Sequence, residues 1–123
     1  MPGELILIVE DNEKNLKLVR DLLQVSGYQT VESITAEDGI LIAKESQPAL
    51  ILMDIQLPGI SGIEALKVLR ADPATRNIPV IAVTASVMAQ DSQDIMDAGF
   101  NGYQRKPIEL KGFLDEVHRL LQV

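Results

Sequence analysis

The sequence predicts an α/β fold with a doubly wound, five-stranded parallel sheet, and two features of its hydrophobic pattern support this. Short apolar runs recur along the chain, and longer segments with helical periodicity separate them. Three runs, Leu5–Val9, Ala49–Met53 and Ile78–Val83, are apolar at nearly every position, so neither face of such a strand suits water. We expect them to be central strands, covered by helices on both faces, in the order βαβαβαβαβα.

The other elements have weaker or differently spaced patterns. Tyr28–Ser33 and Asn101–Gln104 are the candidates for the second and fifth strands. Ser61 and Glu64 have the spacing of a capping box at the start of the third helix. Three helices are expected from clear apolar stripes: the first from Leu16, Val19 and Leu23, the third from Ile63, Leu66 and Leu69, and the fifth from Leu110, Phe113, Leu114, Val117 and Leu121. The second helix, at about 36–46, and the fourth, at about 88–98, have weaker stripes.

Composition narrows the classes of function. The chain has 123 residues, 46% of them hydrophobic, and no linker or repeat, so we expect one domain over residues 1–123. A net charge of −7, with Arg105-Lys106 as the lone basic cluster, argues against direct contact with nucleic acid. Cysteine is absent and His118 is the single histidine, so thiolate and multi-histidine metal sites are excluded. The apolar runs are far too short for a membrane span or a signal peptide, which indicates a soluble, cytoplasmic protein.

Polar residues gather at the expected carboxyl ends of the strands, where open α/β sheets bind ligands. Three carboxylates there, from Glu10, Asp11 and Asp54, would repel one another, and one or more would take up a proton unless a cation lies among them. Mg²⁺ fits, because it binds one or two carboxylates, waters and phosphate oxygens. Thr84 offers a hydroxyl and Lys106 a positive charge, both suited to phosphoryl oxygens. These residues predict phosphoryl transfer with Asp54 as the nucleophile.

Four segments, each at an expected strand end, resemble the receiver domain of two-component response regulators, the CheY-like family. They are "LILIVEDN", "LILMDIQLPGISG", "IPVIAVTA" and "NGYQRKPI", and the resemblance covers the whole chain. The first two are most similar to single-domain receivers of the DivK type and to receivers in hybrid histidine kinases. The resemblance implies a signalling phosphoacceptor that catalyses only its own phosphorylation and dephosphorylation. It fits both a stand-alone regulator and a receiver within a hybrid kinase.

The resemblance also implies roles for the site residues. Asp54 takes a phosphoryl group from a phosphohistidine on a histidine kinase or a histidine phosphotransfer protein. Asp11, Asp54 and the backbone carbonyl of Gln56 ligate Mg²⁺, and Glu10 acts mostly through water. Lys106 contacts the acyl phosphate.

A conformational switch is implied as well. Thr84 moves towards the phosphoryl group and Tyr103, at the switch-aromatic position, turns inward behind it, which alters the surface of the fourth helix, fifth strand and fifth helix. The first helix, around Asn15, Leu16 and Val19, docks the phosphodonor. The Lys106-Pro107 bond resembles the family's cis peptide. Gln104 departs from the family, which has an apolar residue there, while Gln56 and Ser86 occupy positions that tune phosphoryl lifetime.

Simpler structural roles compete with these assignments. Asp54 alone would suit a turn or a cap, and Glu10-Asp11 could cap the first helix, with Asp11 serving both purposes. Thr84 could be an ordinary strand end, Tyr103 could be plain core, and Lys106 alone would be a solvated lysine. His118 lies off the apolar stripe and is expected in solvent.

Three other functions remain as alternatives. Flavodoxins share this topology, but they need a phosphate-binding loop after the first strand, where this chain has Glu10-Asp11-Asn12-Glu13. Aspartyl-phosphate hydrolases carry a second aspartate two residues after the nucleophile, where this chain has Gln56. A receiver-like scaffold that binds partners without phosphate is the third.

Overall fold

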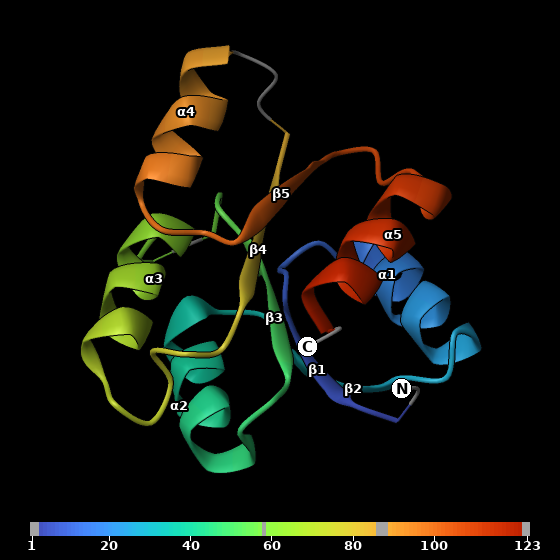
Figure 1. The fold of residues 1–123 in the computed structure, drawn as a ribbon, viewed down its shortest axis with the longest axis horizontal. Coiled ribbons are helices and arrows are strands. Elements are labelled where there is room, and N and C mark those ends of the chain that lie inside the picture. Colours follow the sequence, from blue (N-terminus) through green and yellow to red (C-terminus); the bar gives the residue numbers. More distant parts are fainter. Residues whose placement is uncertain (1–2, 58, 86–88, 122–123) are drawn as a thin grey trace.

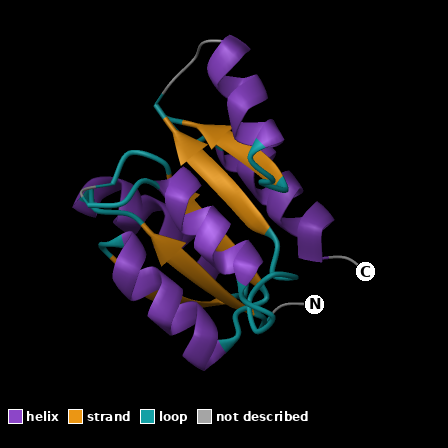
Figure 2. Cartoon of the chain, turned by 90° about the vertical axis from the view of Figure 1, so that its left-hand side faces the viewer, coloured by secondary structure: helices purple, strands orange, loops and turns teal. Residues whose placement is uncertain are grey.

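The computed structural model describes residues 3–57, 59–85 and 89–121, which form one five-stranded parallel sheet in the order β2-β1-β3-β4-β5 (Figure 1). Helices flank the sheet on both faces, as the turned view also shows (Figure 2). The elements are β1 Leu5–Val9, α1 Glu13–Val25, β2 Gln29–Ser33, α2 Ala36–Ser46, β3 Leu50–Asp54, α3 Gly62–Ala71, β4 Val80–Thr84, α4 Ala89–Asp97, β5 Gly102–Arg105 and α5 Leu110–Leu121.

The predicted fold class and element order are confirmed. The three continuously apolar runs are the central strands β1, β3 and β4, and the two weaker candidates are the edge strands β2 and β5. β4 begins at Val80 rather than Ile78, because the N–H of Ile78 closes a turn onto the carbonyl of Thr75 at 3.1 Å and Pro79 has no N–H to donate. β3 extends one residue further than expected and ends on Asp54, which pairs with Val83.

Alternate residues of each strand pack into separate cores on the two faces of the sheet. The helices α2, α3 and α4 cover one face, over Leu7, Val9, Ile51, Met53, Val80 and Ala82. The other face carries α1 and α5, over Ile6, Ile8, Leu50, Leu52, Ile81 and Val83. Side chains from both faces of the central strands are therefore buried, which explains why their sequences lack polar alternation.

This topology brings the carboxyl ends of all five strands to one edge of the sheet. β1 and β3 are neighbours, and β4 and then β5 follow on the same side. Residues that follow these strands in the sequence are therefore adjacent in space. None of the helices within the described ranges is both long enough and apolar enough to cross a membrane.

Candidate functional site

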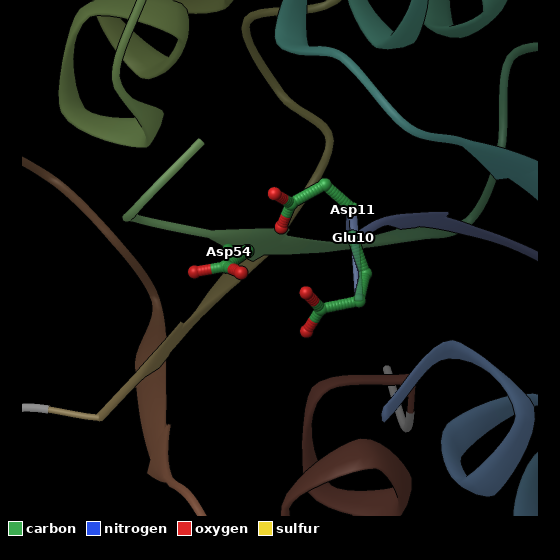
Figure 3. Close-up of side chains that lie close together, drawn as sticks. All are labelled: Glu10, Asp11 and Asp54. Carbon is green, nitrogen blue, oxygen red and sulfur yellow. The ribbon is translucent and has the colours of Figure 1, made fainter. Parts of the chain in front are cut away.

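Three carboxylates meet at the ends of β1 and β3. Glu10 and Asp11 follow β1, and Asp54 is the last residue of β3 (Figure 3). The two strands pair in parallel, with Val9 opposite Met53, so the residues after them emerge side by side. One carboxylate oxygen from each of the three lies within 4.8 Å of the others. The convergence expected from the sequence is thus present.

Asp54 is buried, with 2% of its surface exposed, and both of its carboxylate oxygens have donors. The backbone N–H of Gln56 donates to Oδ1 at 2.9 Å, and the ammonium of Lys106 donates to Oδ2 at 3.0 Å. These bonds offset the desolvation that a carboxylate suffers at the end of an apolar strand. They also fix the orientation of the carboxylate towards the edge of the sheet.

Lys106 bridges the two buried acids, because its Nζ also lies 3.0 Å from Oε1 of Glu10. The second oxygen of Glu10 accepts the backbone N–H of Asn12 at 3.1 Å. Burial and the neighbouring Asp54 carboxyl nevertheless raise the pKa of Glu10 to about 7, against the opposing effect of Lys106. Burial disfavours the charge of Lys106, but the two carboxylates together raise its pKa. The repulsion expected among the acids is therefore only partly relieved by Lys106.

The first helix is capped by a residue that the sequence interpretation passed over. Asn12 is the N-cap of α1, and its Oδ1 accepts the backbone N–H groups of Lys14 at 3.0 Å and Asn15 at 3.1 Å. The idea that Glu10-Asp11 caps this helix is wrong, because Glu10 is directed at Lys106 and Asp11 lies among the carboxylates. The sequence does carry a signal for this cap, because asparagine is a strong N-cap residue. Three consecutive polar residues, however, leave open which of them caps the helix.

A close approach of backbones holds the loop after Asp54. The predicted capping box is confirmed: Ser61 caps α3, with reciprocal bonds between Ser61 and Glu64. Gly62 donates its N–H to the carbonyl of Ile55 at 3.1 Å. A Cβ on Gly62 would lie 2.6 Å from the carbonyl oxygen of Asp54 and 2.8 Å from Cα of Ile55. Only glycine fits here, a requirement the sequence interpretation did not identify.

The fourth and fifth strands bring the remaining predicted residues to the same edge. Thr84, the buried last residue of β4, accepts the backbone N–H of Lys106 through its carbonyl at 2.8 Å. The Lys106-Pro107 bond is cis, in agreement with the resemblance. Tyr103 is 37% exposed, so in this conformation it is not plain core filler. Ser86, expected to influence phosphoryl lifetime, lies outside the described residues.

The unusual Gln104 has a partner on α5. Its Nε2 donates to Oε1 of Glu116 at 3.2 Å, and Arg119 lies 3.7 Å from Oε2 of the same carboxylate. The neighbouring Gly102 makes room for that carboxylate, since a Cβ there would lie 2.7 Å from Cδ of Glu116. A polar contact thus joins β5 to α5 where an apolar one was expected from the resemblance.

The side chains in the cluster suit a hard divalent cation. All three contribute only carboxylate oxygens, the ligand type that Mg²⁺ prefers over the nitrogen and sulfur ligands of softer metals. Burial and the Asp54 carboxyl raise the pKa of Glu10 even though Lys106, the only cation in contact with it among the described residues, lowers it. The site therefore has both the donors for Mg²⁺ and an electrostatic reason to bind it.

Comparison with known proteins agrees with this geometry. Residues 6–118 match the family described as the response regulator receiver domain. The polar-differentiation response regulator DivK of Brucella ovis is 46% identical over 116 residues, covering 94% of each chain. The receiver domain of a Pseudomonas aeruginosa sensor histidine kinase, which has a magnesium ion coordinated in its active-site cleft, is 30% identical with a TM-score of 0.91, covering 98% of this chain and 99% of that one.

Vibrio cholerae CheY4 is 22% identical with a TM-score of 0.90 over 97% of this chain and 99% of its own, and supports the fold alone. The family match spans nearly the whole sheet and every strand end described above. The chain therefore belongs to the family of response regulator receiver domains, the phosphoacceptor modules of two-component signalling.

Proposed function

We propose that Asp54 is the phosphoacceptor of this receiver and takes its phosphoryl group from a phosphohistidine on a histidine kinase or histidine phosphotransfer protein. The observation that carries the proposal is the placement of Asp54, whose carboxylate is held between the Gln56 N–H and Lys106 at the sheet edge. A carboxylate oxygen forms the new bond to phosphorus as the donor's nitrogen–phosphorus bond breaks. The released electron pair stays on the imidazole, which takes up a proton.

Glu10, Asp11 and Asp54 would hold a Mg²⁺ ion, with the Gln56 backbone carbonyl as a further ligand. The cluster geometry and the magnesium ion in the Pseudomonas relative support this assignment. When bound, Mg²⁺ would neutralise part of the negative charge on the acids and the incoming phosphoryl oxygens. Asp11 is exposed, which suits a ligand at the solvent side of the site.

Lys106 would stabilise the phosphorylated state. Its ammonium already contacts Oδ2 of Asp54, so a phosphoryl group on that carboxylate falls within its reach. Thr84 ends the adjacent strand and would approach the same group through its hydroxyl. Tyr103, half-exposed on β5, would turn inward afterwards and alter the surface of α4, β5 and α5.

We assign residues 1–123 to this one domain and expect it to act in the cytoplasm through protein contacts. The family is a signalling phosphoacceptor, and receiver domains interact with histidine kinases or phosphotransfer proteins. The net charge of −7 supports the absence of a direct nucleic-acid partner.

Intact-mass analysis after incubation with acetyl phosphate and Mg²⁺ tests the proposal. We expect the native chain to gain the mass of one phosphoryl group, and the gain to disappear in Asp54→Asn and on addition of EDTA. Asp72→Asn serves as the matched control, because Asp72 lies at the end of α3 and pairs with Lys44. If the folded native chain gains no mass, or if Asp54→Asn still does, the phosphoacceptor assignment is wrong. The phosphate-independent scaffold would then be the better description.

A further inference from the structure

An open apolar groove lies at the opposite edge of the sheet from β5, beside the edge strand β2. Its volume is about 500 Å³. α1 and α2, which pack on opposite faces of the sheet (Figure 1), both contribute residues to its lining. The groove is lined by Leu16, Glu32, Ser33, Ile34, Asp38, Leu41, Ile42 and Glu45.

The lining of the groove exposes apolar surface that the rest of the described chain leaves uncovered. Ile34 is 59% exposed and Leu41 is 57% exposed, among the highest values of any large apolar side chain in the described residues. Both line the same groove, together with the half-buried Leu16 and Ile42. Exposed apolar side chains that share one groove are more typical of a binding surface than exposed apolar residues scattered singly.

One wall of the groove has the spacing of a helix-binding face. Asp38, Leu41, Ile42 and Glu45 stand at positions i, i+3, i+4 and i+7 of α2, so they form a single stripe along the helix. Seven residues of helix rise by about 10 Å, which is about two turns. A partner helix lying along this stripe would place an apolar residue from each of two successive turns against Leu41 and Ile34.

The charge around the groove selects the kind of partner. Every charged residue that lines it is acidic. Glu32 is held by Arg20 of α1 at 2.8 Å, so its charge is partly neutralised within the chain. The carboxylates of Asp38 and Glu45 form no ion pair with any residue in the described ranges. They leave a negative rim at both ends of the apolar stripe.

We propose that this groove docks an amphipathic helix of a partner protein, with aliphatic or aromatic residues facing Ile34 and Leu41 and with Lys or Arg residues facing Asp38 and Glu45. A second copy of this chain is the weaker occupant, because a symmetric contact would bring the same acidic rims together between molecules of net charge −7. An anionic membrane surface is disfavoured for the same reason.

The groove and the phosphorylation site are separate but adjacent. The carbonyl of Ser33, at the end of β2, accepts the backbone N–H of Glu10 at 3.0 Å. The surface of α4, β5 and α5 lies at the far edge of the sheet. A partner in the groove therefore leaves the surface of α4, β5 and α5 accessible, while it shares Leu16 with the α1 face that the resemblance assigns to the phosphodonor.

A peptide titration tests the proposal with the full chain, labelled at the methyl groups of Ile, Leu and Val and observed by NMR. The probe is a helical peptide with Leu and Phe on one face and Lys on the other, and its control carries Glu in place of every Lys. Neither Mg²⁺ nor a phosphodonor is present, so failure of the proposed phosphoryl chemistry would not affect the result. We expect saturable shifts at the methyls of Ile34, Leu41 and Ile42 with the basic peptide only.

Three variants identify the binding surface. Ile34→Ser with Leu41→Ser should raise the dissociation constant at least about tenfold. Asp38→Asn with Glu45→Gln should weaken binding several-fold and leave the apolar surface in place, which keeps the test valid if the first variant folds poorly. Val68→Ser, at an exposed apolar residue of α3 outside the groove, should change nothing.

Several outcomes would overturn the proposal. One is the absence of saturable shifts at the groove methyls, and another is equal binding of the basic and acidic peptides. An equal effect of Val68→Ser would show that the contact is non-specific. Groove methyl shifts that depend on protein concentration without peptide would assign the groove to a second copy of the chain instead.

Discussion

Glu10→Gln should make the protein less sensitive to pH in the absence of metal. The structure buries the Glu10 carboxyl beside Asp54 and raises its pKa from 4.5 to about 7. In the unfolded chain Glu10 ionises near its ordinary pKa, whereas in the folded chain it keeps its proton up to about neutrality. Between these two values the folded state binds more protons, so the free energy of unfolding falls as pH rises. Above the folded pKa the loss is complete.

The size of this effect follows from the pKa. A shift from 4.5 to about 7 corresponds to at most ~3 kcal/mol, at about 1.4 kcal/mol per pH unit. The neighbouring Asp11 is exposed, so water reaches the cluster and screens the charge. We therefore expect about half of the maximum, roughly 1–2 kcal/mol, to be lost between about pH 5 and pH 8. A neutral amide at position 10 removes this contribution at every pH.

Urea unfolding followed by circular dichroism, with EDTA present, measures the difference directly. The native chain should lose roughly 1–2 kcal/mol more than Glu10→Gln over the same pH interval. Glu45→Gln, at an exposed glutamate of α2, is the control for removing one carboxylate and should retain the native pH dependence. If the free energies of unfolding of the native chain and Glu10→Gln change in parallel with pH, the raised pKa does not belong to Glu10.

Other substitutions test the contacts that hold the site and its supports. Gly62→Ala should cost about 1–3 kcal/mol in urea unfolding, because its Cβ would overlap the backbone of Asp54 and Ile55; Gly112→Ala, where the nearest contact is 3.8 Å, is the control. Asn12→Ala should cost about 1 kcal/mol through loss of the α1 cap, and Asn12→Asp should retain most of it. Arg70→Met should lower the free energy of unfolding by about 2 kcal/mol, since the guanidinium donates to the carbonyls of Arg76 and Ile78 and to Oδ1 of Asn101. For each of these three variants, an unchanged unfolding midpoint would contradict the contact that it tests.

The sequence was sufficient for the fold because its strongest signal, continuous apolar strands, is local. Leu50–Met53 has no polar alternation, which only a strand covered on both faces tolerates, and the structure places it at the centre of the sheet. Once that topology is assumed, the strand ends converge without further information. The grouping of Glu10, Asp11 and Asp54 therefore followed from a pattern of a few residues at each strand end.

The contacts between different helices and strands could not be predicted from the sequence. Gln104 stood out as polar where an apolar residue was expected, but its partner Glu116 lies on a different element and no periodicity links the two. No sequence pattern around Gly62 separates it from an ordinary loop glycine, because the backbone that excludes a side chain belongs to the end of β3. Both features depend on the distance between packed elements, which local propensity does not encode.

The position of Lys106 shows how positive charge is distributed in the site. Its ammonium is shared between Glu10 and Asp54 at equal distances, so one positive charge faces two buried carboxyls. Burial, and after it the Asp54 carboxyl, keep the pKa of Glu10 raised in spite of that contact, so the single charge of Lys106 leaves a deficit. A cation bound by the acids would relieve this deficit and release part of the hold on Lys106. The same lysine would then be available to a phosphoryl oxygen on Asp54.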